Sequence, residues 1–273
     1  MFFEPLASGQ NPKVKELLEL LQKASARRES GLFAVEGRRE AERCLGAGFK
    51  ARSLFFCEEI IPSDFLQFIV NEALKLNPAA KLFSVSRKVY EKISYREGTE
   101  GIVAEVFAKG GRLEDLKLRP DALVAVLENV EKPGNLGAVL RSADAAGACA
   151  VISCGPLTDL YNPNLIRASL GACFTVQTAA ASSEDTIKWL KKNGIKILSA
   201  QLQDSRPYYD CDMKGPVALA LGAEDKGLSE LWRKAADQRI RIPMLGVMDS
   251  LNVSVSASVL LYEAVRQRTA GRL

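Results

Sequence analysis

Two short runs of almost unbroken apolar residues constrain the fold of this chain more than any other feature. Residues 122–127 read ALVAVL, and residues 216–221 read PVALAL. A strand with one face in solvent alternates apolar and polar side chains, whereas a strand covered by helices on both faces is apolar throughout. Both runs therefore predict buried strands of a parallel sheet.

Helical and strand patterns alternate on either side of these runs. We expect strands at 32–37, 53–57, 81–85 and 102–107, with helices from 12 to about 26, around 40–44, at 64–76 and at 87–93. Further strands are expected at 148–153, 174–177, 195–200 and 239–242, with helices after 163, at 183–193 and at 228–235. Residues 109–120 are polar, contain glycine and lack apolar periodicity, which predicts a linker. The chain is thus expected to be α/β, with domains at 1–108 and 121–273.

Composition excludes several kinds of chemistry. Histidine is absent, which removes the usual general base near neutral pH and the commonest zinc ligand. The six cysteines form no CxxC pair, so we expect free thiols in a reducing compartment and no metal. No apolar run is long enough to span a membrane, and Glu4 and Pro5 interrupt the first apolar residues, so we expect a cytoplasmic protein without a targeting segment. The net charge of +4 is too small to indicate nucleic acid by itself.

Polar loops that contain glycine follow both apolar strands, where open parallel sheets bind ligands. Residues 131–147 read EKPGNLGAVLRSADAAG; Asn135 is expected to cap a helix, and the guanidinium of Arg141 could grip a phosphate. The simpler interpretation is a capped helix whose arginine pairs with Glu128, Glu131 or Asp144.

Two later loops complete the set of candidate sites. Residues 221–227 read LGAEDKG, a tight loop in which Glu224 could accept hydrogen bonds from a ligand. Its spacing matches neither the P-loop nor the GxGxxG fingerprint. Residues 250–252 read SLN and precede a run of small and β-branched residues that has little intrinsic helix propensity. That run indicates close approach by a backbone, a ligand or a partner, unless Ser250 or Asn252 simply caps a helix.

Taken together, the three segments NLGAVLRSADAAG, LGAEDKGL and IPMLGVMDSLNVSVSAS resemble the signature motifs of the SpoU/TrmH family of RNA 2′-O-methyltransferases. Residues 8–37 are similar to the substrate-binding domain that many members carry before the catalytic one. One departure is Lys132, which precedes Pro133 where family members often carry an acidic residue or Asn.

The resemblance implies a C-terminal SPOUT-type domain, a parallel sheet knotted as a trefoil, preceded by a small α/β RNA-binding domain. It implies S-adenosylmethionine as the methyl donor, bound by Gly222, Ala223, Ile242, Met244 and Leu251. It also implies a catalytic set of Asn135, Arg141, Glu224, Ser250 and Asn252. A homodimer formed through the knot would explain the small residues at 254–258, and rRNA is favoured over tRNA as the substrate.

The role of Arg141 stays open between a base and a clamp for phosphate and developing alkoxide, although a guanidinium is normally protonated. Three other functions compete: a tRNA methyltransferase of the same family, an RNA-binding protein without catalysis, and an unrelated nucleotide-binding enzyme. Retention of Arg141 and Glu224 disfavours the second, and the missing glycine fingerprint disfavours the third.

Overall fold

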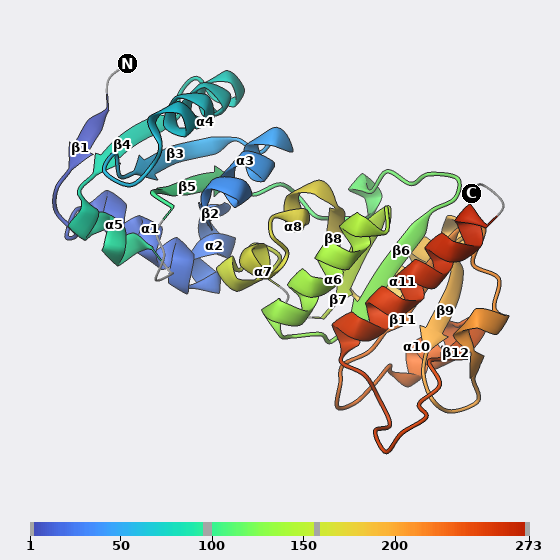
Figure 1. The fold of residues 1–273 in the computed structure, drawn as a ribbon. Helices are drawn as coiled ribbons and strands as arrows, with labels where there is room; N and C mark the ends of the chain where they lie inside the picture. The colour runs from blue at the N-terminus through green and yellow to red at the C-terminus, as the bar shows by residue number, and fades with distance from the viewer. Residues whose placement is uncertain (1–2, 95–99, 156–158, 271–273) are drawn as a thin grey trace. The chain divides into compact units, whose positions relative to one another are not determined.

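The computed structural model describes residues 3–94, 100–155 and 159–270 of the chain (Figure 1). It divides into two compact units. The first comprises Met1–Lys109 together with Tyr161–Thr175, and the second comprises Gly110–Leu160 together with Val176–Leu273.

The first unit is built on a sheet of β1 (Glu4–Leu6), β2 (Leu32–Glu36), β3 (Ala51–Phe56), β4 (Lys81–Val85) and β5 (Ile102–Phe107), in the order β1-β4-β3-β5-β2. Only the pairings of β5, with β2 and β3, are antiparallel among these described strands. Its helices are α1 (Pro12–Gln22), α2 (Ala24–Ser30), α3 (Arg38–Gly46), α4 (Ser63–Leu76) and α5 (Arg87–Ile93). The single helix expected from 12 to about 26 was wrong, because the extended backbone of Lys23 separates α1 from α2.

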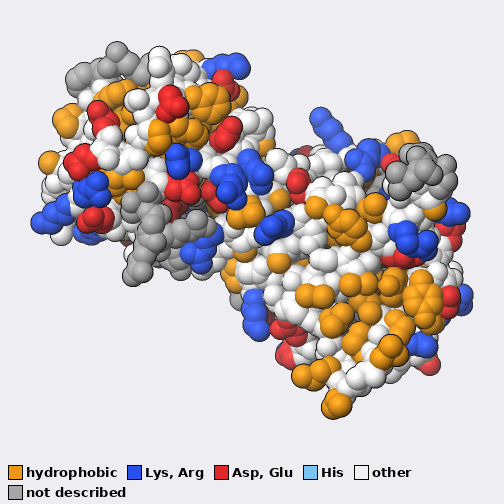
Figure 2. All heavy atoms as spheres, viewed as in Figure 1, with side chains coloured by type: hydrophobic (Ala, Val, Ile, Leu, Met, Phe, Trp, Pro, Cys, Tyr) orange, Lys and Arg blue, Asp and Glu red, His pale blue; other side chains and the backbone are white. Residues whose placement is uncertain are grey.

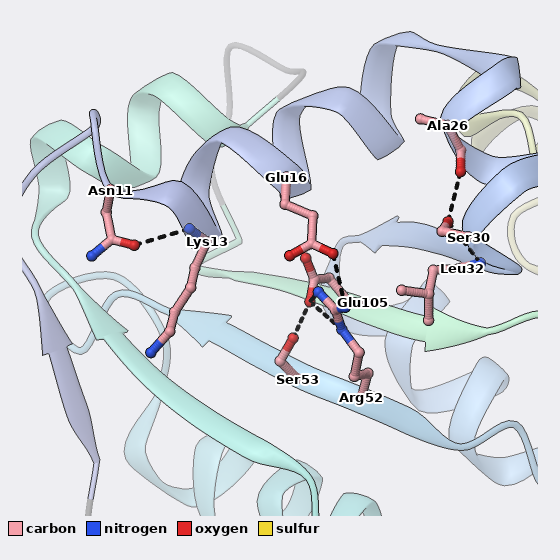
Figure 3. A network of polar contacts seen from close by, with 9 residues as sticks. All are labelled: Asn11, Lys13, Glu16, Ala26, Ser30, Leu32, Arg52, Ser53 and Glu105. Carbon is pink, nitrogen blue, oxygen red and sulfur yellow. Dashed lines mark hydrogen bonds and ion pairs between the residues drawn. The ribbon is translucent and has the colours of Figure 1, made fainter.

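A buried carboxylate ties α1 to this sheet (Figure 3). Glu105 on β5 is 1% exposed and accepts hydrogen bonds from Ser53 Oγ and, at 2.8 Å, from Arg52 Nη2. Arg52 also donates to Glu16 of α1 at 2.8 Å. Burial raises the pKa of Glu105 despite these partners. Charge-assisted hydrogen bonds of this kind are strong and specific in geometry.

The segment Tyr161–Thr175 packs within the first unit, although sequence patterns had assigned it to the second domain. The Tyr161 ring stacks on Phe33 with centroids 4.2 Å apart, and Arg43 donates to the carbonyl of Leu170 at 2.6 Å. The segment forms α7 (Pro163–Ala168) and α8 (Ala172–Thr175). The strand expected at 174–177 was therefore misplaced, because its first residues belong to α8.

The second unit contains seven described strands, all parallel to their neighbours. Their order is β10-β12-β9-β11-β6-β7-β8. They are β6 (Leu123–Glu128), β7 (Ala150–Cys154), β8 (Gln177–Ala181), β9 (Lys196–Ala200), β10 (Arg206–Pro207), β11 (Val217–Leu221) and β12 (Gln238–Arg241). The two apolar runs of the sequence are the adjacent strands β6 and β11, buried throughout, which confirms the predicted sheet. The predicted trefoil knot stays a prediction.

Helices cover both faces of this sheet. On one face α11 (Val253–Thr269) packs against α6 (Pro133–Ala145), β6 and β11 (Figure 1). On the other face, α9 (Ser183–Lys192) and α10 (Glu230–Ala235) share a core cluster with β6 and β11. Leu113 also belongs to that cluster, so the expected linker is packed on the second unit from Gly110 onward. It includes the 3₁₀ turn η1 (Leu113–Asp115); a second, η2 (Tyr208–Asp210), follows β10.

Small residues at 254–258 serve packing within the chain. Ala257 is fully buried, so it cannot contact a partner subunit as the resemblance had implied. The hydroxyls of Ser258 and Ser142 share a hydrogen bond of 2.7 Å between α11 and α6. Small side chains let two helices approach closely, which accounts for Ala257 and Ser258; the predicted homodimer stays a prediction.

All six cysteines are buried and free, as the sequence predicted.

Candidate functional site

The polar loops that follow β6, β11 and β12 come together at the carboxyl edge of the parallel sheet. Glu224, after β11, lies at the centre. Its Oε1 accepts hydrogen bonds from Asn252 Nδ2 at 2.5 Å and from Asn135 Nδ2 at 3.2 Å. Its Oε2 accepts from Lys132 Nζ at 3.3 Å. One carboxylate therefore joins all three candidate segments.

Asn252 is held in one orientation by contacts at both ends of its amide. Its Oδ1 caps α11 by accepting from Ser254 N at 3.0 Å and from Ser254 Oγ at 2.6 Å. Its Nδ2 then faces Glu224 and also donates to Asn135 Oδ1 at 3.2 Å. The cap expected at Ser250 or Asn252 is thus confirmed at Asn252, and the same side chain belongs to the site.

The expectation that Asn135 caps α6 was wrong. The helix begins at Pro133, Lys132 occupies the cap position, and Asn135 lies in the first turn. Proline is favoured at a first helical position because its φ is preset and its missing N–H has no helical acceptor there. The early start leaves the amide of Asn135 free to bond Glu224.

Lys132 sets the charge state of this network. Its ammonium, hydrogen-bonded to Glu224, lowers the pKa of that carboxyl below its usual value. Hydrogen bonds from the amide of Asn135 act in the same direction. Glu224 is therefore held as a carboxylate whose lone pairs are already engaged, which makes it a weak proton acceptor.

Arg141 lies on α6 with its side chain exposed. Within the described ranges, no group accepts a hydrogen bond or forms an ion pair with its guanidinium, so the simpler interpretation of an internal pair was wrong. Glu128, one suggested partner, instead accepts from Ser229 and Ser183. Among the described residues, Arg141 also makes no hydrogen bond to Glu224 or Asn252.

A cavity of about 320 Å³ opens beside Glu224, at the ends of β9, β11 and β12. All five residues predicted to bind the cofactor line it, namely Gly222, Ala223, Ile242, Met244 and Leu251. Glu224 and Ser250 line it as well, whereas Asn135, Arg141 and Asn252 do not. The volume is within the range of small-molecule sites, about 300–1,000 Å³.

The loop that forms one wall of the cavity folds back on itself at Gly222. A Cβ on Gly222 would lie 2.0 Å from the carbonyl carbon of Gly227. Gly227 itself has φ +63°, and its N–H donates to the carbonyl of Ala223 at 2.9 Å. Only glycine permits such close approach, so backbone atoms of this loop form the wall.

Sequence reasoning missed the role of one residue of this region and did not single out another. Glu128, at the end of β6, accepts hydrogen bonds from Ser229 N at 2.6 Å and Ser229 Oγ at 2.7 Å, which anchors the end of the Gly222–Gly227 loop. An acidic residue closing an apolar strand was the available signal. Arg233 of α10 lines the cavity, and no sequence pattern distinguished it.

Across residues 3–94, 100–155 and 159–270, no group of three acidic, cysteine or histidine side chains could hold a metal ion. No described helix is both long and apolar enough to cross a membrane.

Comparison with known proteins agrees with this geometry. Residues 122–262 match the SpoU rRNA Methylase family, and residues 11–104 match the MRM3-like substrate binding domain. A 23S rRNA (uridine(2479)-2′-O)-methyltransferase of Streptomyces viridochromogenes is 29% identical over 97% of this chain and 93% of its own length. The 23S rRNA (guanosine-2′-O-)-methyltransferase RlmB of Ralstonia nicotianae is 38% identical over 62% of this chain and 70% of its own length.

A solved structure extends the likeness to both units. The AdoMet-bound rRNA methyltransferase of Sinorhizobium meliloti aligns with a TM-score of 0.89 and 29% identity, covering 97% of this chain and 98% of that chain. The order of the domains and the parallel sheet agree with the expected SpoU-type fold. The chain belongs to the SpoU rRNA methylase family.

Proposed function

We propose that this chain transfers a methyl group from S-adenosylmethionine to a ribose 2′-hydroxyl of rRNA. The observation that carries the proposal is the position of Glu224, which belongs both to the Asn135–Asn252 network and to the wall of the cavity. The relatives that cover the chain support the substrate class, because they act on 23S rRNA by name.

The residues around the cavity fit the methyl donor. Ile242, Met244 and Leu251 offer apolar surface, and the loop at Gly222 presents backbone N–H and C=O groups to a ligand. When bound, S-adenosylmethionine supplies an electrophilic methyl group on its sulfonium sulfur. These four residues, with Ala223, are therefore proposed as the cofactor-binding set.

The other side chains of this site are assigned to positioning the substrate and the catalytic groups. A ribose hydroxyl is a weak nucleophile, and no histidine is present to remove its proton. The engaged carboxylate of Glu224 is suited to holding Asn135 and Asn252 in place rather than to accepting the proton. We assign Ser250, which lines the cavity, to orienting the ribose or the methionine moiety.

Arg141 is proposed as the clamp on an adjacent RNA phosphate and on the developing alkoxide. Its exposed guanidinium offers donors that no described group uses, in a planar fork that matches a phosphate. A guanidinium remains protonated at accessible pH, which favours a clamp over a base.

The test is transfer of labelled methyl groups into separated rRNA and tRNA pools from a strain that lacks the gene, followed by mapping of 2′-O-methyl sites. We expect label in rRNA, and loss of turnover in Arg141→Ala with S-adenosylmethionine binding retained. Label only in tRNA would show the alternative substrate. Near-full turnover by Arg141→Lys would exclude the planar clamp, and absence of any heat with the methyl donor would indicate a non-catalytic RNA-binding protein.

A homodimer through the C-terminal region is part of the proposal. Apolar side chains gather over α11 and the loop before it (Figure 2). Leu245, Val247 and Met248 in that loop are 98%, 104% and 77% exposed. A cluster of this kind is unfavourable in water unless a partner covers it. Sedimentation velocity should show a dimer that Val247→Ser with Met248→Ser dissociates; a monomeric wild-type chain would exclude it. The cytoplasmic location stays a prediction.

A further inference from the structure

Arg233 reaches the cavity from the face of the sheet opposite to α11. Its neighbour Trp232 is fully buried in the core cluster, together with Ile187 and Leu190 of α9. That anchor fixes α10, and the next side chain, Arg233, turns to the edge of the sheet where it lines the cavity. Leu251 and Val253 line the same cavity next to α11. Asn135 and Asn252 do not line this cavity, whereas Glu224, which accepts hydrogen bonds from both, does.

The guanidinium of Arg233 lacks a partner in the described part of the chain. Its Nε is buried and makes no hydrogen bond, and no described acceptor takes a hydrogen bond from its other nitrogens. The neighbouring arginines differ, because Arg241 donates to the carbonyl of Ser205 and Arg239 donates to the carbonyl of Arg233 at 3.3 Å. A cation removed from water without a partner is unfavourable, so a partly buried, unpaired guanidinium at a cavity indicates a ligand group that meets it.

We propose that Arg233 is a cofactor-binding residue that donates hydrogen bonds to an acceptor group of S-adenosylmethionine. The inference rests on the proposed function. The strongest acceptors of the cofactor are its methionine carboxylate and the ring nitrogens of its adenine. Because Arg233 lines the cavity, which Asn135, Arg141 and Asn252 do not line, we assign it to binding the donor and not to methyl transfer itself. Its loss should raise KM for the donor while kcat at saturation is retained.

The test compares two variants of α10, one at Arg233 and one at its neighbour Lys234. Arg233→Met removes the charge and keeps an unbranched side chain, and Lys234→Met is the matched control. Lys234 does not line the cavity; its side chain is 75% exposed and pairs with Glu230 at 3.8 Å. Titration calorimetry with S-adenosylmethionine should show affinity at least about tenfold weaker for Arg233→Met and unchanged for Lys234→Met, since one charged hydrogen bond is at stake.

Thermal unfolding without ligand separates binding from folding. Because Arg233 has no partner among the described residues, Arg233→Met should unfold at the same temperature as the wild type or higher, while the stabilisation produced by S-adenosylmethionine falls. If Arg233→Met lowered the unfolding temperature without ligand but kept the full stabilisation by S-adenosylmethionine, the role of Arg233 would be structural and the inference would be overturned.

Decarboxylated S-adenosylmethionine identifies the acceptor. If Arg233 meets the carboxylate, the wild type should bind the decarboxylated compound more weakly, and Arg233→Met should bind both compounds alike. If Arg233 meets the adenine, the variant should weaken both compounds equally. Wild-type affinity of Arg233→Met for S-adenosylmethionine would overturn this inference alone, whereas a wild-type chain that fails to bind the donor would refute the proposed function with it.

Discussion

Replacing Gly222 with alanine should distort the loop that forms one wall of the cavity. The new Cβ would lie 2.0 Å from Gly227 C, 2.2 Å from Gly227 O and 2.3 Å from Leu228 N, all of them backbone atoms that cannot rotate away. Ordinary contact begins near 3.4 Å, so the two sides of the loop must separate by about 1.4 Å. Overpacking of this kind costs about 1–3 kcal/mol.

That cost translates into two measurements. At about 2–4 °C per kcal/mol for a domain of 150–250 residues, the unfolding temperature should fall by about 2–12 °C. Affinity for S-adenosylmethionine should fall by about tenfold or more, since the displaced backbone groups lose at least one hydrogen bond to the donor, worth about 1.4 kcal/mol. Differential scanning calorimetry and titration calorimetry on the same preparation give both values.

Gly215→Ala is the matched control, because a Cβ at Gly215 has open space around it. It should leave the unfolding temperature and the affinity unchanged. If Gly222→Ala bound S-adenosylmethionine within about twofold of the wild type, the backbone wall at Gly222 would not be part of the donor site, and the reasoning from close approach would be refuted.

Two other perturbations test the residues around Glu224. Glu128→Ala leaves the Ser229 N–H without its buried acceptor, which should cost about 3 kcal/mol and lower the unfolding temperature by about 6–12 °C. Glu131 is exposed, so Glu131→Ala is the control and should leave the unfolding temperature unchanged. Equal unfolding temperatures for the two variants would contradict the anchoring role of Glu128. Lys132→Met should raise the pKa of Glu224, because the ammonium that lowers it is gone. Glu224 then protonates at a higher pH, so the acidic limb of the pH profile for S-adenosylmethionine binding should move upward and return with Lys132→Arg. An unmoved limb would show that Glu224 does not control binding.

Local patterns predicted the central strands β6 and β11 because burial on both faces demands apolar side chains at every position. Patterns also identified the three loops whose residues form the Glu224 network and the cavity. The same local reasoning placed Asn135 at a cap, because asparagine is a favoured helix N-cap residue. The helix began two residues earlier at Pro133, and the asparagine joined the site instead.

Other features depend on partners far away in sequence. Strand β1 is three residues long and forms by pairing with β4, nearly 80 residues later. The segment Tyr161–Thr175 belongs to the first unit and not to the second domain where it was expected, because Tyr161 stacks on Phe33 and Arg43 donates a hydrogen bond to the carbonyl of Leu170. Such contacts have no local signature, since each side chain is ordinary in its own segment.

The sequence by itself determined the parallel sheet, the family and the residues of three loops, because periodicity, glycine positions and motif order are local properties of the chain. Only the tertiary structure decided how those residues are used. It joined Lys132, Asn135 and Asn252 through one carboxylate and left Arg141 unpaired among the described residues. It also brought Arg233 to the same cavity as Gly222. Hydrogen bonding and desolvation depend on which groups meet in space, and that is set by packing over the whole domain.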